Sequence, residues 1–447
     1  MTASDTIYAL SSGAGRSAIA IIRMSGSHTP DLLVRMAGRL PPARRMSLRA
    51  IRDGRTGEVL DKAMVVWFPG PGSFTGEDCA EIHLHGSPAV VSAVMALLSS
   101  LPGVRPAEPG EFTRRGFLNG KMDLVEAEGL GDLLQARTSG QRRQAFRQMS
   151  GQASSRFESW REQLMQIRAH IEAGVDFADE PGVAEAAAPA IDMNIQALHS
   201  QISAELRRST GSELLRDGFR VVLAGCPNTG KSSLLNVLAG REAAIVSDLP
   251  GTTRDAIEVT LELDGMPVIV TDTAGLRSNV ADAVEEEGVR RSRQHVSGAD
   301  LVVWVWSADV MGSKVLDTSI EQPDVLVENK YDLLENRLGL LRNDADGSIR
   351  ISCQTREGIA ELLAELTARL RERFGDVESA LFVSARQKLA AERSVRHLKD
   401  ALGIGSDRLE LKAESIRFAS EEIGRLTGRV DVEEWLGAIF SRFCIGK

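Results

Sequence analysis

The chain has 447 residues, of which 43% are hydrophobic and 26% are charged, and this length favours about three domains. Its formal net charge of −9 excludes a protein that coats nucleic acid through overall charge, so any RNA contact needs a local basic surface. The apolar runs are shorter than the roughly 18–20 residues of a membrane span, and the first residues show no signal-peptide pattern. Four widely separated cysteines argue against a disulfide framework or a zinc site. We therefore expect a cytoplasmic protein without a membrane segment.

Residues 1–120 mix the patterns of strands and helices. Ile19–Ile22 and Ala63–Phe68 are apolar runs typical of buried strands, and Ala89–Leu98 has the pattern of a helix. Turns rich in glycine and proline, such as Pro69–Gly72, separate these runs. We expect an N-terminal α+β domain over this range.

Helical patterns fill residues 121–215 and 376–447. Apolar residues in both segments recur at spacings of three and four, which places them on one face of a helix. These residues are Trp160, Leu164, Ile167 and Ile171 in the first segment, and Leu436, Ile439, Phe440 and Phe443 in the second. The stretch Asp179–Gly182 interrupts the first segment. Neither segment has enough helices to cover its own apolar faces. We therefore expect one discontinuous helical domain, interrupted by residues 216–375.

Residues 216–375 alternate strand and helix patterns. The apolar runs are Phe219–Ala224, Val268–Val270, Leu301–Trp306 and Val325–Val327. Runs that are apolar at nearly every position indicate strands covered on both faces of a sheet. We therefore expect a mainly parallel α/β domain over this range.

A phosphate-loop pattern follows the first of these strands. Residues 225–232 are GCPNTGKS, which matches G-x-x-x-x-G-K-[ST] between a strand and a helix. Glycines let backbone amides approach the phosphates, and the start of the following helix adds a positive dipole. We expect Lys231 to reach the β- and γ-phosphates and Ser232 to bind Mg²⁺. Alone, the pattern indicates a nucleotide without naming the base.

A second motif indicates guanine. Asn329, Lys330 and Asp332 form an N-K-x-D sequence after a predicted strand. The Asp332 carboxylate can accept hydrogen bonds from both N1–H and the exocyclic amine of guanine, a donor pair that adenine lacks. Ser352 and Cys353 follow a further short strand and are expected to close over the base. In this order after a phosphate loop, these elements predict a GTP-binding domain.

Two segments between the motifs are expected to respond to the γ-phosphate. Thr253, in the sequence GTTRD at 251–255, is placed to complete the coordination of Mg²⁺. Asp272 ends a predicted strand, where it would hold a magnesium-bound water. Gly275 would let a backbone N–H meet the γ-phosphate.

The residue after Gly275 is Leu276, so the glutamine that usually orients the attacking water is absent. Two other residues are candidates for this chemistry. Asn228 could offer a side-chain oxygen to a monovalent cation beside the phosphates, which would act as an arginine finger does. Glu285 could reach the attacking water, although a solvated charge in an acidic helix start is the alternative interpretation.

Motifs along the chain resemble one known family. Residues 225–236 (GCPNTGKSSLLN), with 251–255, are similar to the Era-like bacterial GTPases. The final FSRFCIGK narrows the resemblance to the MnmE (TrmE) family of tRNA-modification GTPases. The motifs RMSG, SFTGED and PGEFTRRGFLNGKMDL, which begin at residues 23, 73 and 109, agree with this family, so the resemblance covers essentially the whole chain.

The resemblance implies a multidomain α/β and α+β fold with a Ras-like P-loop GTPase inserted in the helical domain. It implies that the N-terminal domain binds a 5-formyl-tetrahydrofolate-type folate and forms a homodimer. It places at the folate Arg23, Glu81, Lys121 and Lys447. Cationic side chains suit the carboxylates of a folate, and a carboxylate suits the donor edge of a pterin.

The resemblance also assigns the nucleotide and cation contacts. Potassium would be held by the side chains of Asn228 and Thr252 and the backbone of Ser247 and Leu249. Glu285 matches the catalytic glutamate of the family. The positions expected at GTP are Asn228, Thr229, Gly230, Lys231, Ser232, Ser233, Ser247, Asp248, Leu249, Pro250, Gly251, Thr252, Thr253, Asp272, Thr273, Ala274, Gly275, Asn329, Lys330, Asp332, Ser352 and Cys353.

The partners that the resemblance implies are tRNA and a flavoprotein of the MnmG type, joined in a heterotetramer. The pair would add an aminomethyl-type or carboxymethylaminomethyl group to carbon 5 of the wobble uridine of certain tRNAs. The alternative is an Era-like regulatory GTPase of ribosome assembly, which would need a basic RNA-binding module.

Two features of the sequence each have two possible interpretations. Cys444 could act in covalent or redox chemistry near the folate, or pack as a small residue beside Phe440 and Phe443. Between Arg35 and Arg55 there are seven arginines and one acid, so this stretch could contact RNA or form a solvated surface.

Overall fold

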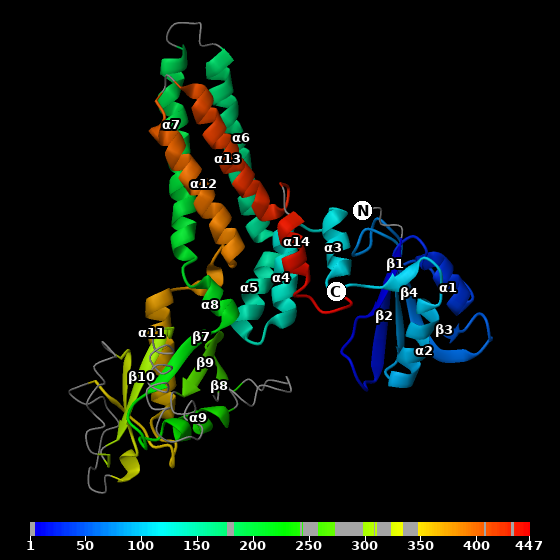
Figure 1. Ribbon diagram of the computed structural model, residues 1–447, viewed down its shortest axis with the longest axis horizontal. Helices are drawn as coiled ribbons and strands as arrows, with labels where there is room; N and C mark the ends of the chain where they lie inside the picture. Colours follow the sequence, from blue (N-terminus) through cyan, green and yellow to red (C-terminus); the bar gives the residue numbers. More distant parts are fainter. Residues whose placement is uncertain are drawn as a thin grey trace, which may run out of the picture. The chain divides into compact units, whose positions relative to one another are not determined.

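The computed structural model describes residues 5–176, 183–241, 244, 258–272, 298–307, 309–310, 323–333, 347–405, 408–430 and 433–447. The chain forms two compact units (Figure 1). The first contains Met1–Gly131, Arg147–Ala169 and Ile416–Lys447, and the second contains Asp132–Phe146 and His170–Ser415. The predicted break at Asp179–Gly182 lies outside the described residues.

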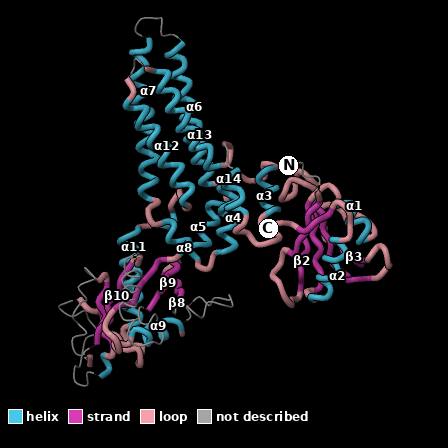
Figure 2. Tube along the Cα trace, viewed as in Figure 1, coloured by secondary structure: helices cyan, strands magenta, loops and turns pink. Residues whose placement is uncertain are grey.

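A six-stranded sheet organises the first unit, with the strand order β3-β4-β5-β2-β1-β6. β1 and β6 pair in parallel, and the other neighbouring strands are antiparallel. The strands are β1 (Thr6–Leu10), β2 (Ile19–Ser25), β3 (Ser47–Arg52), β4 (Val59–Phe68), β5 (Cys79–His85) and β6 (Val104–Pro106). Helices α1 (Thr29–Ala37) and α2 (Pro88–Ser99) pack against it (Figure 2). The expected α+β arrangement is confirmed.

The two faces of this sheet differ because side chains alternate along each strand. Ile22 of β2 and Ile82 of β5 point to the core that includes Leu33 of α1 and Leu98 of α2. Arg23 and Glu81, their neighbours in sequence, therefore lie on the opposite face.

Three helices that lie wholly or mostly in the first unit share one apolar cluster. They are α3 (Glu111–Leu118), α4 (Leu124–Gln135) and α14 (Glu433–Phe440). The predicted apolar stripe of the C-terminal segment is confirmed: it packs in one cluster with Leu124 and Ala127. Gly110 has φ +70°, and a Cβ there would lie 2.5 Å from the Phe440 carbonyl oxygen, so this close approach requires glycine.

Long helices fill part of the second unit. α7 (Val183–Arg208) packs along α12 (Ala385–Gly403), although 176 residues separate their ends in the sequence (Figure 1). The Lys412 ammonium, on α13 (Leu409–Thr427), contacts the Asp192 carboxylate of α7 at 2.6 Å. α5 (Ser139–Met149) and α8 (Ser212–Asp217) also lie wholly or largely in this unit, whereas most of α6 (Gln152–Asp176) and of α13 belongs to the first unit. The discontinuous helical domain is thus confirmed, while its exact bounds stay predictions.

The second sheet has the order β12-β11-β10-β7-β9-β8. All neighbouring strands pair in parallel except β8 and β9. The strands are β7 (Phe219–Ala224), β8 (Glu258–Leu263), β9 (Met266–Asp272), β10 (Leu301–Ser307), β11 (Val325–Asn329) and β12 (Ile349–Arg350). This confirms the mainly parallel α/β fold. Loops at the carboxyl ends of such strands are the usual place for ligands.

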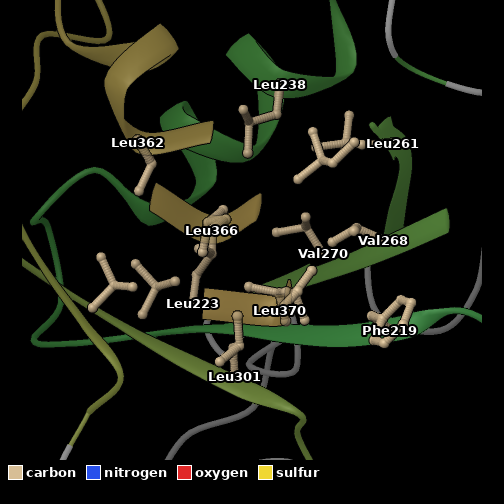
Figure 3. Packing of buried hydrophobic residues seen from close by; sticks show 14 of the residues in the cluster. Phe219, Leu223, Leu238, Leu261, Val268, Val270, Leu301, Leu362, Leu366 and Leu370 are labelled. Carbon is tan, nitrogen blue, oxygen red and sulfur yellow. The ribbon is translucent and has the colours of Figure 1, made fainter. Parts of the chain in front are cut away.

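The core of this sheet is continuous with two helices, α9 (Lys231–Ala239) and α11 (Ile359–Phe374). Figure 3 shows Leu362, Leu366 and Leu370 of α11 packed beside Leu223 and Val270 of the central strands. Two short 3-10 turns, η2 (Tyr331–Leu333) and η3 (Val377–Ser379), follow β11 and α11. Among the described residues, no helix is long and apolar enough to span a membrane.

Candidate nucleotide and folate sites

The phosphate loop links β7 to α9, and its glycines allow two close approaches. Gly225 has φ +139°, and a Cβ there would lie 2.1 Å from the Val305 carbonyl oxygen of β10. Gly230 has φ +92°, and its Cβ would lie 2.1 Å from Nδ2 of Asn329. Side chains at either position would displace the loop from the sheet. Asn228, inside the loop, takes a left-handed backbone with φ +63°.

Lys231 and the loop together form a site with anion-binding character. The Lys231 side chain is 5% exposed, and its ammonium donates to the carbonyl oxygens of Gly225 (2.9 Å) and Cys226 (2.8 Å). These bonds hold the positive charge over the loop at the start of α9. A helix N-terminus presents free N–H groups, and the cation adds to their field. The arrangement suits a polyphosphate.

Ser232 and Asp272 meet next to this loop. The Ser232 hydroxyl donates to Oδ2 of Asp272 over 2.5 Å, and Asp272 is 1% exposed at the end of β9. A hydroxyl and a carboxylate are hard oxygen donors, which Mg²⁺ prefers. The sequence predicts Ser232 as a magnesium ligand and Asp272 as the residue that holds a magnesium-bound water, and the structure brings these two residues together.

A cavity of about 330 Å³ lies beside the loop. Its lining residues are Gly230, Ser233, Asn329, Lys330, Asp332, Leu333, Cys353 and Gln354. Asn329 is 2% exposed and donates from Nδ2 to the Thr229 carbonyl oxygen at 2.9 Å. Its buried Oδ1 has no hydrogen-bond partner among the described residues. An unsatisfied buried acceptor costs free energy, so it favours a ligand that donates to it.

The cavity wall is held by neighbouring contacts. Lys330 has φ +60°, and its ammonium pairs with the Asp309 carboxylate at 2.7 Å. Buried Ser352 accepts from the Thr355 N–H at 3.1 Å, which stabilises the turn that carries Cys353. Burial raises the pKa of the Cys353 thiol to about 11; a hydrogen bond from Asn329 opposes this rise and the charge of Asp332 adds to it.

Several predicted nucleotide, potassium and catalytic residues lie outside the described part of the chain. They are Ser247, Asp248, Leu249, Pro250, Gly251, Thr252, Thr253, Thr273, Ala274, Gly275 and Glu285. Their roles stay predictions.

A second polar cluster lies on the open face of the first sheet. Arg23 and Glu81 stand directly opposite each other on β2 and β5, and their side chains pair at 2.9 Å. The Arg23 guanidinium lies 5.7 Å from the ring centre of Phe74 and 5.9 Å from that of Phe112. Nε2 of His83 is 3.2 Å from Oε2 of Glu81. Burial raises the pKa of Glu81, but the bonds from Arg23 and His83 outweigh it and leave the pKa below its usual value.

The end of the sequence joins this cluster. The Ser11 hydroxyl donates to the Gly446 carbonyl oxygen at 2.9 Å, and Gly446, with φ +98°, lies so close to β1 that a Cβ would be 2.5 Å from the Leu10 carbonyl oxygen. Burial lowers the pKa of Lys447, the charge of Arg23 lowers it further, and Glu81 opposes both. Lys447 is therefore an electrostatic neighbour of both residues.

Lys121, the fourth predicted folate residue, is exposed. Its side chain lies beside Gly76, since a Cβ at Gly76 would be 3.1 Å from the Lys121 Cε. Gly76 is two residues from Phe74 in the sequence. Cys444 is also exposed, so it does not pack as a buried residue on the apolar stripe.

Sequence reasoning missed His83, Phe74 and Phe112. His83 follows Glu81 by two residues on the same strand, a spacing that places both on one face and could have indicated it.

Comparisons with known families match most of the chain. Residues 6–121 match the family described as the GTP-binding protein TrmE N-terminus, and residues 124–444 match the MnmE helical domain. The chain belongs to the MnmE family. A tRNA modification GTPase MnmE from Methylobacterium sp. (strain 4-46) is 48% identical over 99% of this chain and 100% of its own. That from Rhodopseudomonas palustris (strain ATCC BAA-98 / CGA009) is 47% identical over 99% of both chains.

MnmE membership makes the chain a GTP hydrolase of the tRNA-modification class. The matches cover both domains that flank the GTPase, which favours this class over the ribosome-assembly alternative. Among solved structures, the G domain of the T. maritima FeoB iron transporter is 27% identical over 34% of this chain and 98% of its own, with a TM-score of 0.26. A TM-score this low does not support a fold assignment. The assignment therefore rests on the strand order of the second sheet.

Proposed function

We propose that the chain is a potassium-activated GTPase that, with a flavoprotein partner, modifies carbon 5 of the wobble uridine of certain tRNAs. Hydrolysis of GTP drives a conformational change during the addition of an aminomethyl or carboxymethylaminomethyl group. The observation that carries the proposal is the Ser232–Asp272 contact beside the Lys231 ammonium. It supports a triphosphate bound with magnesium next to a base cavity.

Magnesium fits the donor set of this site. Ser232 and Asp272 would hold the ion directly or through water, with Thr253 as a further predicted ligand, and the ion would neutralise charge on the phosphates. Lys231 binds the β- and γ-phosphates, and the amides at the start of α9 orient them. Asp332 and Asn329 select guanine in the 330 Å³ cavity.

Potassium activation rests on the family and on Asn228. The left-handed backbone of Asn228 is part of the loop that contacts the phosphates. Its side-chain oxygen, with Ser247, Leu249 and Thr252, would hold the cation, whose charge compensates that of the phosphates. Glu285 would orient or deprotonate the attacking water. Where arginine fingers have been measured they contribute about 10³–10⁵ in rate, and the cation would take the place of such a finger.

The N-terminal cluster suits a folate. Arg23 and Lys447 present cationic groups for the carboxylates of the ligand, and Glu81 presents an acceptor for a pterin edge. Lys121 would add a further cation from the edge of the cluster. The folate would supply a one-carbon unit. We further propose that this domain forms the homodimer, that a flavoprotein of the MnmG type completes a heterotetramer, and that the protein acts in the cytoplasm.

The test is mass analysis of wobble nucleosides from cells that lack this chain. The modified uridine should disappear, return with the wild-type chain, and stay absent with Lys231→Ala. Arg207→Ala serves as a control, because Arg207 is an exposed residue of α7 and belongs to neither proposed site. Unchanged wobble nucleosides in the deleted cells would contradict the proposal.

A further inference from the structure

One surface of the N-terminal sheet carries positive charge that the sites above do not use. We call it the arginine surface. It begins at the last turn of α1 and ends at the hairpin between β3 and β4. Its exposed members are Arg35, Arg39, Arg44, Arg45, Arg52 and Arg55. Residues 6–121 hold 14 lysines and arginines against 9 acids, whereas the whole chain has a net charge of −9. Positive charge is thus concentrated in this domain.

Few carboxylates neutralise this surface. In the part of the chain that the structure describes, Arg55 pairs with Asp53 at 3.3 Å, and the other five members form no ion pair. Arg44 instead donates to the Gly72 carbonyl oxygen, and its guanidinium lies 5.9 Å from the ring centre of Phe68. Arg52 donates to the Gly57 carbonyl oxygen at 3.3 Å. The guanidinium charges therefore remain available to an external anion.

The fold gathers these residues from separate elements. A Cβ at Gly54, in the β3–β4 hairpin, would lie 3.9 Å from the Arg35 carbonyl oxygen of α1. The end of α1 is therefore adjacent to the hairpin that carries Arg55, and Figure 1 shows α1 beside β3. The Arg44 N–H donates to the Trp67 carbonyl oxygen at 2.7 Å, which fixes the connecting loop on β4.

Protection of the sheet edge explains only part of this charge. β3 is an edge strand, and positive side chains on an edge discourage pairing with another sheet. Arg35 and Arg39 do not belong to the strand, however: Arg35 is on α1 and Arg39 follows it. A surface that extends over helix, loop and hairpin is larger than edge protection requires.

We propose that the arginine surface binds the phosphate backbone of tRNA. This inference rests on the proposed function, which makes tRNA the substrate. Guanidinium groups bind phosphate oxygens in pairs of hydrogen bonds, and several at once bind a polyanion without reading its sequence. The surface positions the tRNA, while the selection of the uridine occurs elsewhere.

The test compares two doubly substituted full-length chains with the same change in charge. Arg39→Glu with Arg45→Glu alters the surface at two residues whose side chains make no hydrogen bond or ion pair in the described structure. Arg207→Glu with Arg396→Glu alters two exposed arginines of α7 and α12. The affinity for an unmodified tRNA transcript is measured over a series of KCl concentrations. GTP hydrolysis without tRNA is measured in parallel.

We expect the Arg39/Arg45 variant to bind tRNA at least tenfold more weakly than wild type. The negative slope of log affinity against log salt should become shallower by about 1.5, because two phosphate contacts are lost. The Arg207/Arg396 variant should keep the wild-type slope. Equal losses in both variants, or an unchanged slope in the first, would overturn the inference. The inference would also be overturned if the Arg39/Arg45 variant lost binding to phosphatidylserine vesicles but still bound tRNA as wild type does. That result would indicate a membrane-binding surface.

The hydrolysis assay separates this inference from the proposed function. Both variants should hydrolyse GTP at the wild-type rate. A wild-type chain that hydrolyses GTP but binds no tRNA would overturn the arginine surface alone. A chain that binds tRNA through this surface but does not hydrolyse GTP would contradict the proposed function alone.

Discussion

The Ser232 hydroxyl lies 2.5 Å from Oδ2 of Asp272, although 40 residues separate them in the sequence. Ser232 belongs to the first turn of α9, and Asp272 is the last residue of β9. The contact therefore joins the first turn of α9 to the central sheet. A movement of β9 would thus alter the proposed magnesium position.

Substitution of Ser232 tests this metal position. Ser232→Ala removes one of the two oxygen donors but leaves Lys231 and the loop amides. We expect GTP affinity in Mg²⁺ to fall by at least tenfold, which corresponds to about 1.4 kcal/mol, and affinity in EDTA to match that of wild type. Fluorescence titration with a labelled GTP analogue measures both. An equal loss in Mg²⁺ and in EDTA would contradict a magnesium ligand at this residue.

The β8–β9 hairpin forms hydrogen bonds with α5 near its turn, at the end of β9 opposite Asp272. Oε1 of Glu262 accepts from the N–H (3.0 Å) and the hydroxyl (2.7 Å) of Ser139, and the Gly140 N–H donates to the Gly265 carbonyl oxygen at 3.2 Å. A carboxylate at a helix N-terminus satisfies free N–H groups and opposes the helix dipole. Glu262 thus caps α5 from a strand that pairs with β9.

Glu262→Ala should loosen this cap. We expect amide hydrogen exchange across residues 137–141 to accelerate by about fivefold, the equivalent of about 1 kcal/mol. Glu258→Ala, at the exposed start of the same strand, is the matched control and should leave these amides unchanged. Exchange mass spectrometry of the full chain measures both variants. Equal acceleration in the two variants would count against a cap.

The thiols should differ sharply in reactivity. Burial raises the pKa of Cys353 to about 11, so at pH 8 only about one molecule in a thousand carries the reactive thiolate. Cys444 is exposed. Iodoacetamide at pH 8 should therefore label Cys444 well before Cys353, as measured by peptide mass spectrometry. Faster labelling of Cys353 would show that its thiol is neither buried nor hindered.

The proposed folate cluster should be sensitive to alkaline pH. Burial lowers the pKa of Lys447, with a further contribution from Arg23, so this ammonium loses its proton below the usual lysine range. Binding of an anionic folate should weaken as the pH rises through the lowered pKa. Lys447→Arg should remove that weakening, because arginine stays charged. Titration of folate fluorescence at successive pH values checks this; identical pH profiles for both chains would exclude Lys447 from the site.

The sequence indicates how the residues of the proposed nucleotide site come together more clearly than it does for the proposed folate cluster. Lys231, Ser232 and Asp272 follow or end strands of one parallel sheet, so strand order alone brings them to the same edge. The pairing of Arg23 with Glu81 depends on strand register, and the proximity of Lys447 depends on the docking of residue 446 against β1; no local pattern specifies either. The edge strand β3 was not predicted, because its arginines interrupt the apolar alternation.

GTP turnover in potassium and in sodium, at equal ionic strength, tests the central claim most directly. The account predicts substantially faster hydrolysis by the wild-type chain in KCl than in NaCl, and no turnover in either salt with Lys231→Ala. Glu285→Ala should bind GTP as wild type does and lose the potassium stimulation. Equal turnover in the two salts would contradict the account.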